Sequence, residues 1–126
     1  MKHIFIAIDE QKIDLALAYY DIGIDQRNYD YCFLDDRLIL HKNKDKLELI
    51  PLFTDIDCYA QRIGNKSKKI DYWGKTIIPP HSVVELRRKL KNGFKLKYTF
   101  SFEMRKFVKL VDYATSNNYY IVHIGI

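Results

Sequence analysis

Residues 71–91 read DYWGKTIIPPHSVVELRRKLK and carry the clearest structural signals of the chain. Pro79 and Pro80 disfavour helix before them, so the residues that precede this pair are expected to be extended and to enter a sharp turn. Ser82 and Glu85 have the spacing of a capping box, in which each side chain accepts a hydrogen bond from the other residue's backbone N–H. We therefore expect a helix to begin at Ser82 and to continue to residue 91.

Outward from this stretch, apolar periodicity predicts alternating strands and helices. The first half reads as a strand over 2–8, a helix over 9–23, strand pieces over 31–34 and 37–41, a hairpin partner over 47–50 and a helix over 55–63, before a basic loop over 65–69. The second half reads as an extended segment over 76–78, the helix over 83–91, a strand over 94–100, a helix that Ser101 caps, and a strand over 119–124. The last strand has almost no polar face, which predicts a place in the middle of the sheet.

This order predicts an α/β fold, a single domain with a mixed β-sheet and about four packed helices. Helices between strands favour parallel crossovers, whereas the hairpin adds an antiparallel pair. An α+β arrangement is the alternative. The length of 126 residues suits one domain with one core.

Composition sets further bounds. With 48% hydrophobic and 14% aromatic residues, the chain is too apolar for a disordered protein. It has no apolar run near the roughly 20 residues that cross a bilayer. The start of the chain does not read as a signal peptide, so we expect a cytoplasmic protein in which Cys32 and Cys58 are buried free thiols.

The net charge of +5 is unevenly distributed. Residues 1–63 hold 8 Lys/Arg against 12 Asp/Glu, whereas residues 64–126 hold 13 against 4. Such asymmetry is typical of proteins that bind nucleic acid or a charged protein. It predicts a surface with an acidic and a basic part.

Motifs for catalysis or for cofactors are not found. The five glycines are isolated, which excludes a phosphate-binding glycine-rich loop, and no Cys or His spacing predicts a zinc site. We expect no cofactor and no metal. His3 and His123 lie in the two terminal strands and can be neighbours in the sheet, where a histidine pair could cleave RNA by acid–base chemistry. Buried structural histidines are the interpretation that we favour, and local hydrogen bonding explains the acidic pairs Asp35-Asp36 and Asp55/Asp57.

The basic second half also fits a nucleic-acid-binding module. Its cations could neutralise phosphates and its aromatic side chains could stack on bases: Arg87, Arg88, Lys89, Lys91, Lys95, Lys97, Arg105, Lys106 and Lys109, with Phe94, Tyr98 and Phe100. Period-two alternation, however, places these aromatics with Leu96 on one face and Lys95 and Lys97 on the other. Nucleic-acid binding is therefore the alternative function.

Two segments carry a family resemblance. The run YWGKTIIPPHS (residues 72–82) and the ending DYATSNNYYIVHIGI (residues 112–126) resemble small bacterial immunity proteins, which protect cells from polymorphic toxins, as in contact-dependent growth inhibition. The resemblance implies a non-enzymatic, cytoplasmic protein that binds and neutralises a cognate toxin domain, often a nuclease. Inhibitors that plug a nuclease cleft are commonly acidic, whereas this chain is net basic. Either its acidic first half makes the contact, or its basic second half meets an acidic face elsewhere on the toxin.

Charged and aromatic residues of both halves are the expected contacts with the partner. They are Tyr29, Tyr31, Asp35, Asp36, Tyr72, Trp73, Arg87 and Arg88. No membrane contact is expected.

Overall fold

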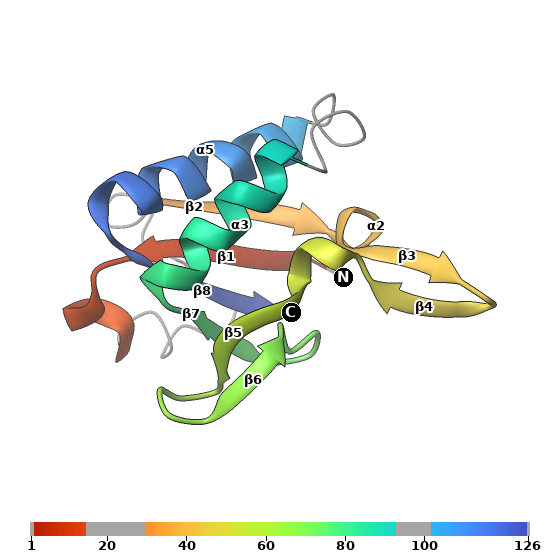
Figure 1. The fold of residues 1–126 in the computed structure, drawn as a ribbon, viewed down its shortest axis with the longest axis horizontal. Coiled ribbons are helices and arrows are strands. Elements are labelled where there is room, and N and C mark those ends of the chain that lie inside the picture. Colours follow the sequence, from red (N-terminus) through yellow and green to blue (C-terminus); the bar gives the residue numbers. More distant parts are fainter. Residues whose placement is uncertain (1, 15–29, 93–101, 126) are drawn as a thin grey trace.

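The computed structural model describes residues 2–14, 30–92 and 102–125. Its strands are β1 (Lys2–Ile8), β2 (Asp30–Asp35), β3 (Leu40–Asn43), β4 (Lys46–Leu49), β5 (Thr54–Ala60), β6 (Lys66–Lys69), β7 (Lys75–Ile78) and β8 (Tyr120–Gly125). Its helices are α2 (Asp36–Ile39), α3 (Pro80–Asn92) and α5 (Phe102–Asn117), with short 3₁₀ turns η1 (Glu10–Lys12) and η2 (Pro51–Phe53). Figure 1 shows their arrangement.

Six strands form the main sheet, in the order β2-β1-β8-β7-β5-β6. The strand predicted over 119–124 is β8, and its place between β1 and β7 confirms the expected central position. Its side chains from Ile121 to Ile124 are all buried, which explains why the segment has no polar face. The remaining strands, β3 and β4, form a separate hairpin that projects from the body of the domain (Figure 1).

Every strand pairing in the described residues is antiparallel, so the expected parallel crossovers are wrong. A single helix between two strands returns the chain to the same end of the sheet and makes them parallel. Here α3 and α5 follow one another between β7 and β8, and the second helix reverses the direction again. The described chain is thus a mixed α/β domain with an antiparallel sheet and three α-helices instead of about four.

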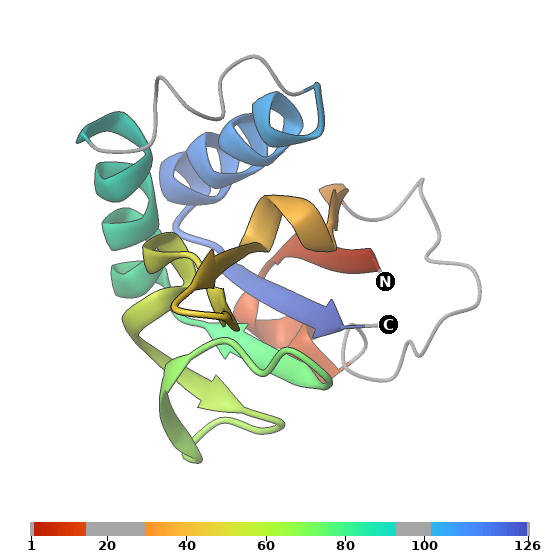
Figure 2. The ribbon, with the colours of Figure 1, turned by 90° about the vertical axis from the view of Figure 1, so that its right-hand side faces the viewer.

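The long helices α3 and α5 cover one face of the main sheet (Figure 2). α5 buries Met104, Phe107, Leu110, Val111 and Ala114, and α3 buries Ser82, Val83, Leu86 and Leu90. Between helices and sheet, the rings of Phe5, Phe53 and Phe107 contact one another, with centroids 4.9–5.7 Å apart. Burial of such apolar faces is what holds helices of this length on a sheet.

The opposite face of the sheet carries a second apolar cluster. Its buried members alternate in sequence with those of the first cluster: Ile4, Ile6, Ile8, Ile13, Ile77, Val122 and Ile124. Alternation with both faces buried explains the nearly continuous apolar runs of β1 and β8.

The helix expected over 55–63 is wrong, because this segment forms β5. Ile56 and Cys58 point into the core, whereas Asp55 and Asp57 point outward, which is the period-two pattern of a strand. Asp55 has a positive φ of 55°, at a register irregularity between β5 and β6. The acids that suggest the first turn of a helix therefore belong to the exposed face of a strand.

Two further segments differ from the expectation. Residues 66–69 of the expected basic loop form β6, an edge strand whose lysines discourage pairing with other chains. The strand expected over 37–41 is wrong for its first three residues, because residues 36–39 form the short helix α2 and β3 begins only at Leu40. Asp35 caps α2 by accepting a 3.2 Å hydrogen bond from the Arg37 N–H. The hairpin of β3 and β4 is confirmed, and Lys44 and Asp45 both adopt positive φ at its turn.

The expected capping box at Ser82 is also wrong, because α3 begins two residues earlier, at Pro80. Proline is favoured in the first turn of a helix, where its missing N–H has no partner to lose. Ser82 lies inside this turn, and its hydroxyl donates to the backbone carbonyl of Asp57 in β5. Its role is to tie α3 to the sheet.

Two expected elements lie wholly or mainly outside the described residues. They are most of the helix over 9–23 and the strand over 94–100. Of the former, the described start is η1, where the Asp9 side chain accepts from the Gln11 N–H. In the parts of the chain that are described, no helix has the length and hydrophobicity needed to span a membrane.

Candidate functional site

A buried polar chain lies at one end of the main sheet. His3 pairs across β1 and β8 with Gly125, which places His123 diagonally opposite, and the expected proximity of the two histidines is confirmed. His3 Nδ1 lies 2.9 Å from His123 Nε2, and His3 Nε2 lies 2.8 Å from Asp36 Oδ1. Both imidazoles are fully buried.

The hydrogen bonds assign the protons of this chain. Asp36, as a carboxylate, accepts from His3 Nε2–H, so neutral His3 accepts at Nδ1 from His123 Nε2–H. Burial lowers the pKa of His3, against the effect of Asp36, and burial together with His3 lowers the pKa of His123 to about 3. Both rings are therefore neutral near pH 7, and no substrate reaches them at zero exposure. Of the buried polar side-chain atoms described, His123 Nδ1 is the one without a hydrogen-bond partner.

A tight turn over residues 71–74 packs against this buried chain. The ring of Tyr72 packs against that of His3, with centroids 5.0 Å apart, and the Tyr72 hydroxyl hydrogen-bonds to Asp36. Burial alone would raise the pKa of Asp36, but hydrogen bonds from His3 and Tyr72 lower it below its usual value. The turn can approach β8 because residue 125 is glycine: a Cβ there would lie 2.1 Å from the Tyr72 carbonyl oxygen.

Backbone and side-chain hydrogen bonds fix the same turn. Gly125 N–H donates to the Gly74 carbonyl at 2.8 Å, and the Asp71 N–H donates to Thr76 Oγ1 at 2.7 Å. The Asp71 carboxylate accepts from the Trp73 N–H at 3.2 Å. Held in this way, Trp73 remains 75% exposed, with its ring edge to face with that of Tyr72.

The turn forms one wall of an open cleft of about 1110 Å³. The projecting hairpin also lines this cleft, as do residues of β5 and β6. Its lining is Leu40, His41, Asn43, Leu47, Glu48, Leu49, Pro51, Thr54, Ala60, Ser67, Lys69, Ile70, Asp71, Tyr72 and Trp73. The volume of this cleft is at or above the upper end of the range for small-molecule pockets, and the cleft is open. It therefore suits a polypeptide better than a small molecule.

Two large apolar side chains stand exposed on the walls of the cleft. Leu47 of β4 is 73% exposed and Trp73 of the turn is 75% exposed. Exposed aromatic and aliphatic side chains beside a concave surface are the usual anchors of protein interfaces. The cleft is therefore a candidate surface for a macromolecular partner.

The structure separates the predicted contact residues. Tyr72 and Trp73 line the cleft, and Asp36 lies behind Tyr72. The half-buried Tyr31 lies on β2 with its ring against Phe33, at a centroid distance of 5.4 Å. Asp35 caps α2 and donates its backbone N–H to Glu103.

The two predicted arginines do not line the cleft. Arg87 Nε lies 2.8 Å from Asp112 of α5, and Arg88 pairs with Glu85 of its own helix at 2.8 Å. Their charges are thus already compensated. Tyr29 lies outside the described residues.

Sequence reasoning missed the hairpin wall of the cleft. Leu47 sits between Lys46 and Glu48, and this short charged segment reads as an ordinary hairpin strand. One sequence signal could have indicated Leu47. An isolated two-stranded hairpin cannot bury both of its faces, so an apolar side chain on it stays exposed. That Leu47 lines the same cleft as Trp73 follows only from the tertiary structure.

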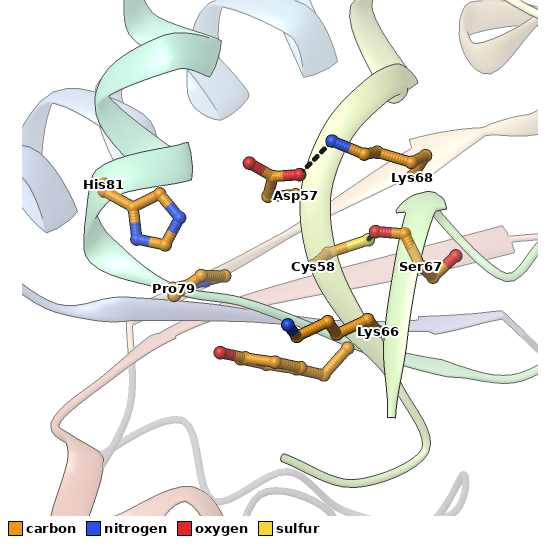
Figure 3. Close-up of a pocket in the computed structure, with 8 residues that line it drawn as sticks. Asp57, Cys58, Lys66, Ser67, Lys68, Pro79 and His81 are labelled. Atoms are coloured by element: carbon orange, nitrogen blue, oxygen red, sulfur yellow. Dashed lines mark hydrogen bonds and ion pairs between the residues drawn. The ribbon is translucent and has the colours of Figure 1, made fainter. Parts of the chain in front are cut away.

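A second, smaller hollow of about 430 Å³ lies beside the start of α3 (Figure 3). Cys58 points toward Ser67, and its thiol donates to the carbonyl oxygens of Ser67 and Lys69 at 3.6 and 3.4 Å. Burial raises the pKa of Cys58, so it is a thiol and not the thiolate that a nucleophile requires.

Two of the charged side chains that line this hollow pair with each other. The Lys68 ammonium donates to Asp57, which lowers the pKa of that carboxyl. Cys32, elsewhere in the core, is likewise a free buried thiol, and burial raises its pKa to about 12. No cluster of three or more metal-ligating side chains is present in the described ranges.

The chain was compared with protein-family models, curated proteins and solved structures, and none of the three comparisons gives a significant match. What this chain offers by its own geometry is a broad groove with exposed Leu47 and Trp73 on its walls.

Proposed function

We propose that this protein is an immunity-type inhibitor, which binds and neutralises a cognate bacterial toxin domain, such as a nuclease, by protein–protein contact at the cleft. The observation that carries the proposal is the pair of exposed side chains Leu47 and Trp73 on its two walls. A rigid turn presents Trp73, so little conformational entropy is lost when a partner covers it. The sequence resemblance to immunity proteins names the class of partner.

Nucleic-acid binding remains the alternative function, and two features of the described residues favour it less. Arg87 and Arg88 are paired with carboxylates and are not free to meet phosphates. In addition, Glu48 and Asp71 lie in the lining of the cleft beside the exposed Trp73. A strand of nucleic acid stacked on Trp73 would bring its phosphates near these two carboxylates.

Co-expression with the toxin encoded beside this gene tests the proposal. The protein is expected to restore growth and to form a one-to-one complex. Trp73→Ala should weaken the complex by about 2 kcal/mol or more, roughly thirtyfold in Kd, because a central interface tryptophan is truncated. Isothermal titration calorimetry gives the affinity.

The matched control is Phe102→Ala, which removes an aromatic side chain that is 65% exposed and does not line the cleft. This variant should bind like the unaltered protein. Toxicity that persists when the unaltered protein is co-expressed would contradict the proposed function. An unchanged affinity of the Trp73→Ala variant would place the contact outside the cleft.

A further inference from the structure

The carboxylates around the cleft are already engaged within the chain. Glu48 accepts from Asn43 Nδ2 at 3.1 Å and lies 3.8 Å from His41 Nε2. Asp71 accepts from Gln61 Nε2 at 3.0 Å and from the Trp73 N–H. In the hairpin turn, Asp45 lies 3.6 Å from the Lys42 ammonium. Lys42 compensates the charge of Asp45, whereas the amide donors hold Glu48 and Asp71 in place and leave their negative charge.

Several lysines around the same cleft have no such partner. Lys44 and Lys46 stand at the tip of the hairpin, and Lys69 lines the wall formed by β6. All three are exposed and form no ion pair with another described residue. Uncompensated charge at the rim of an interface sets the sign of the partner that is attracted. The cleft therefore combines exposed apolar side chains with unpaired lysines at its rim and the carboxylates of Glu48 and Asp71 in its lining.

We propose that the cleft binds an acidic segment of the protein partner, which seats a large apolar side chain between Leu47 and Trp73 and places carboxylates near Lys44, Lys46 and Lys69. This inference rests on the proposed function and states the chemistry of the contact. The segment must combine both features: the acids provide attraction, and the apolar side chain replaces water over the exposed leucine and tryptophan.

Glu48 and Asp71 favour a polypeptide over a nucleic acid as the occupant. Both lie in the lining of the cleft, where a continuous row of phosphates would meet them. A peptide carries negative charge only at certain side chains, and its backbone N–H groups can donate to these two carboxylates. The mixed lining thus fits an acidic peptide with alternating chemistry.

The positive charge of these lysines also indicates which part of a nuclease toxin would contact the cleft. Grooves that bind nucleic acid are basic, because they neutralise phosphates. An acidic segment that fits the cleft would therefore belong to a part of the toxin outside that groove. The proposed contact uses lysines of both halves of the chain, because Lys44 and Lys46 belong to the acidic first half and Lys69 to the basic second half.

Trp73 provides a direct readout, since it is the single tryptophan of the chain. The probe is a short synthetic peptide with a Phe-Leu pair flanked by glutamates, compared with the same peptide flanked by lysines and with an oligothymidylate. The glutamate peptide should shift the Trp73 emission to shorter wavelength and bind at least about tenfold more tightly than the lysine peptide. Added salt should weaken it. No saturable shift with this peptide, or a larger one with the oligonucleotide, would overturn the proposal.

Charge reversal tests the same contact in the full complex. The variant Lys44→Glu/Lys46→Glu/Lys69→Glu should lose at least about tenfold in affinity for the toxin domain and for the glutamate peptide, mainly through slower association. Its control reverses three other exposed lysines with the same change in net charge: Lys12→Glu, Lys91→Glu and Lys109→Glu.

The two proposals fail in different ways. If the unaltered protein protects cells and the cleft variant protects as well as its control, the acidic segment is refuted and the inhibitor function stands. If the unaltered protein does not bind the toxin, the function is refuted, and the peptide titration still decides whether the cleft prefers acidic segments.

Discussion

At the scale of single residues, the chain Asp36–His3–His123 links three parts of the structure: α2, β1 and β8. Neither imidazole can take up a second proton without breaking this arrangement. A proton on His3 Nδ1 would face the N–H of His123 Nε2, and a proton on His123 Nδ1 would be buried without an acceptor. The same chain supports the Tyr72 ring. Its protonation state therefore bears on the stability of the fold and on the wall of the cleft.

This arrangement predicts a loss of stability in mild acid. The pKa values of His3 and His123 are lowered in the folded state, so the unfolded state, with a pKa near 6.5, binds more protons as the pH falls. The free energy of unfolding should decrease below about pH 6.5, by up to about 1.4 kcal/mol per pH unit for each histidine. Asp36 adds to the loss only below about pH 4, because its pKa is also lowered. Urea denaturation between about pH 7.5 and about pH 4.5 measures the slope.

Two variants assign this slope to the buried pair. His123→Phe should reduce it, since one of the two titrating rings is removed, whereas His81→Gln, at an exposed position, should leave it unchanged. Stability that does not change between about pH 6.5 and about pH 4.5 in the unaltered protein would contradict the neutral, buried assignment.

At the scale of elements, the turn over residues 71–74 connects the buried chain to the cleft. Gly125 permits its approach, and the backbone hydrogen bond between Gly125 and Gly74 holds it there. Tyr72 then faces inward to His3, while Trp73 faces outward. The position of Trp73 thus depends on a glycine in a different strand.

Gly125→Ala should displace this turn. The added methyl would lie 2.1 Å from the Tyr72 carbonyl oxygen, which is backbone and can move only with the turn. We expect a loss of about 1–3 kcal/mol in the free energy of unfolding and a changed Trp73 emission. Denaturation curves and fluorescence spectra give the two quantities.

Gly64→Ala is the comparison, because a Cβ there meets nothing within 4 Å although its φ is +101°. This variant should lose stability through backbone strain alone and keep the Trp73 emission of the unaltered protein. An unchanged emission in Gly125→Ala as well would show that the turn does not depend on this contact.

Several elements could be predicted from local pattern alone. The strands β1 and β8 are apolar runs rich in β-branched residues, and α5 shows a helical stripe from Met104 to Ala114. In β5, local signals conflict: Thr54 and the acids after it suggest a helix start, and the alternation of Ile56 and Cys58 suggests a strand. The segment forms a strand because it pairs with β6 and β7, and this pairing cannot be predicted from the segment itself.

At the scale of the whole molecule, the antiparallel topology and the cleft could not be predicted, because both depend on how distant segments meet. The histidine pair could be anticipated, since two terminal strands are natural neighbours, but its link to Asp36 needs the position of α2. The cleft needs the hairpin and the turn that carries Trp73 to come together, and no sequence pattern relates these two segments. Exposed Trp73 was a candidate contact, whereas Leu47 was not.

The fold also determines which charged side chains of the two halves are engaged within the chain and which are open to a partner. Of the acids in the first half, Asp36 is used in the buried chain, and Asp57 and Glu48 are engaged in an ion pair or hydrogen bonds. By contrast, Lys69 in the lining of the cleft and Lys44 and Lys46 at the hairpin tip are exposed and form no ion pair with another described residue. The functional surface is therefore defined by which charges remain uncompensated and not by the totals of each half.

Hydrogen–deuterium exchange of the protein, alone and with its toxin domain, tests the central claim that the cleft is where the partner binds. The account predicts new protection in β3, β4 and the turn over residues 71–74, with little change in the exposed positions of α3 and α5. Protection that appears on these helices and leaves the hairpin and the turn unchanged would contradict it.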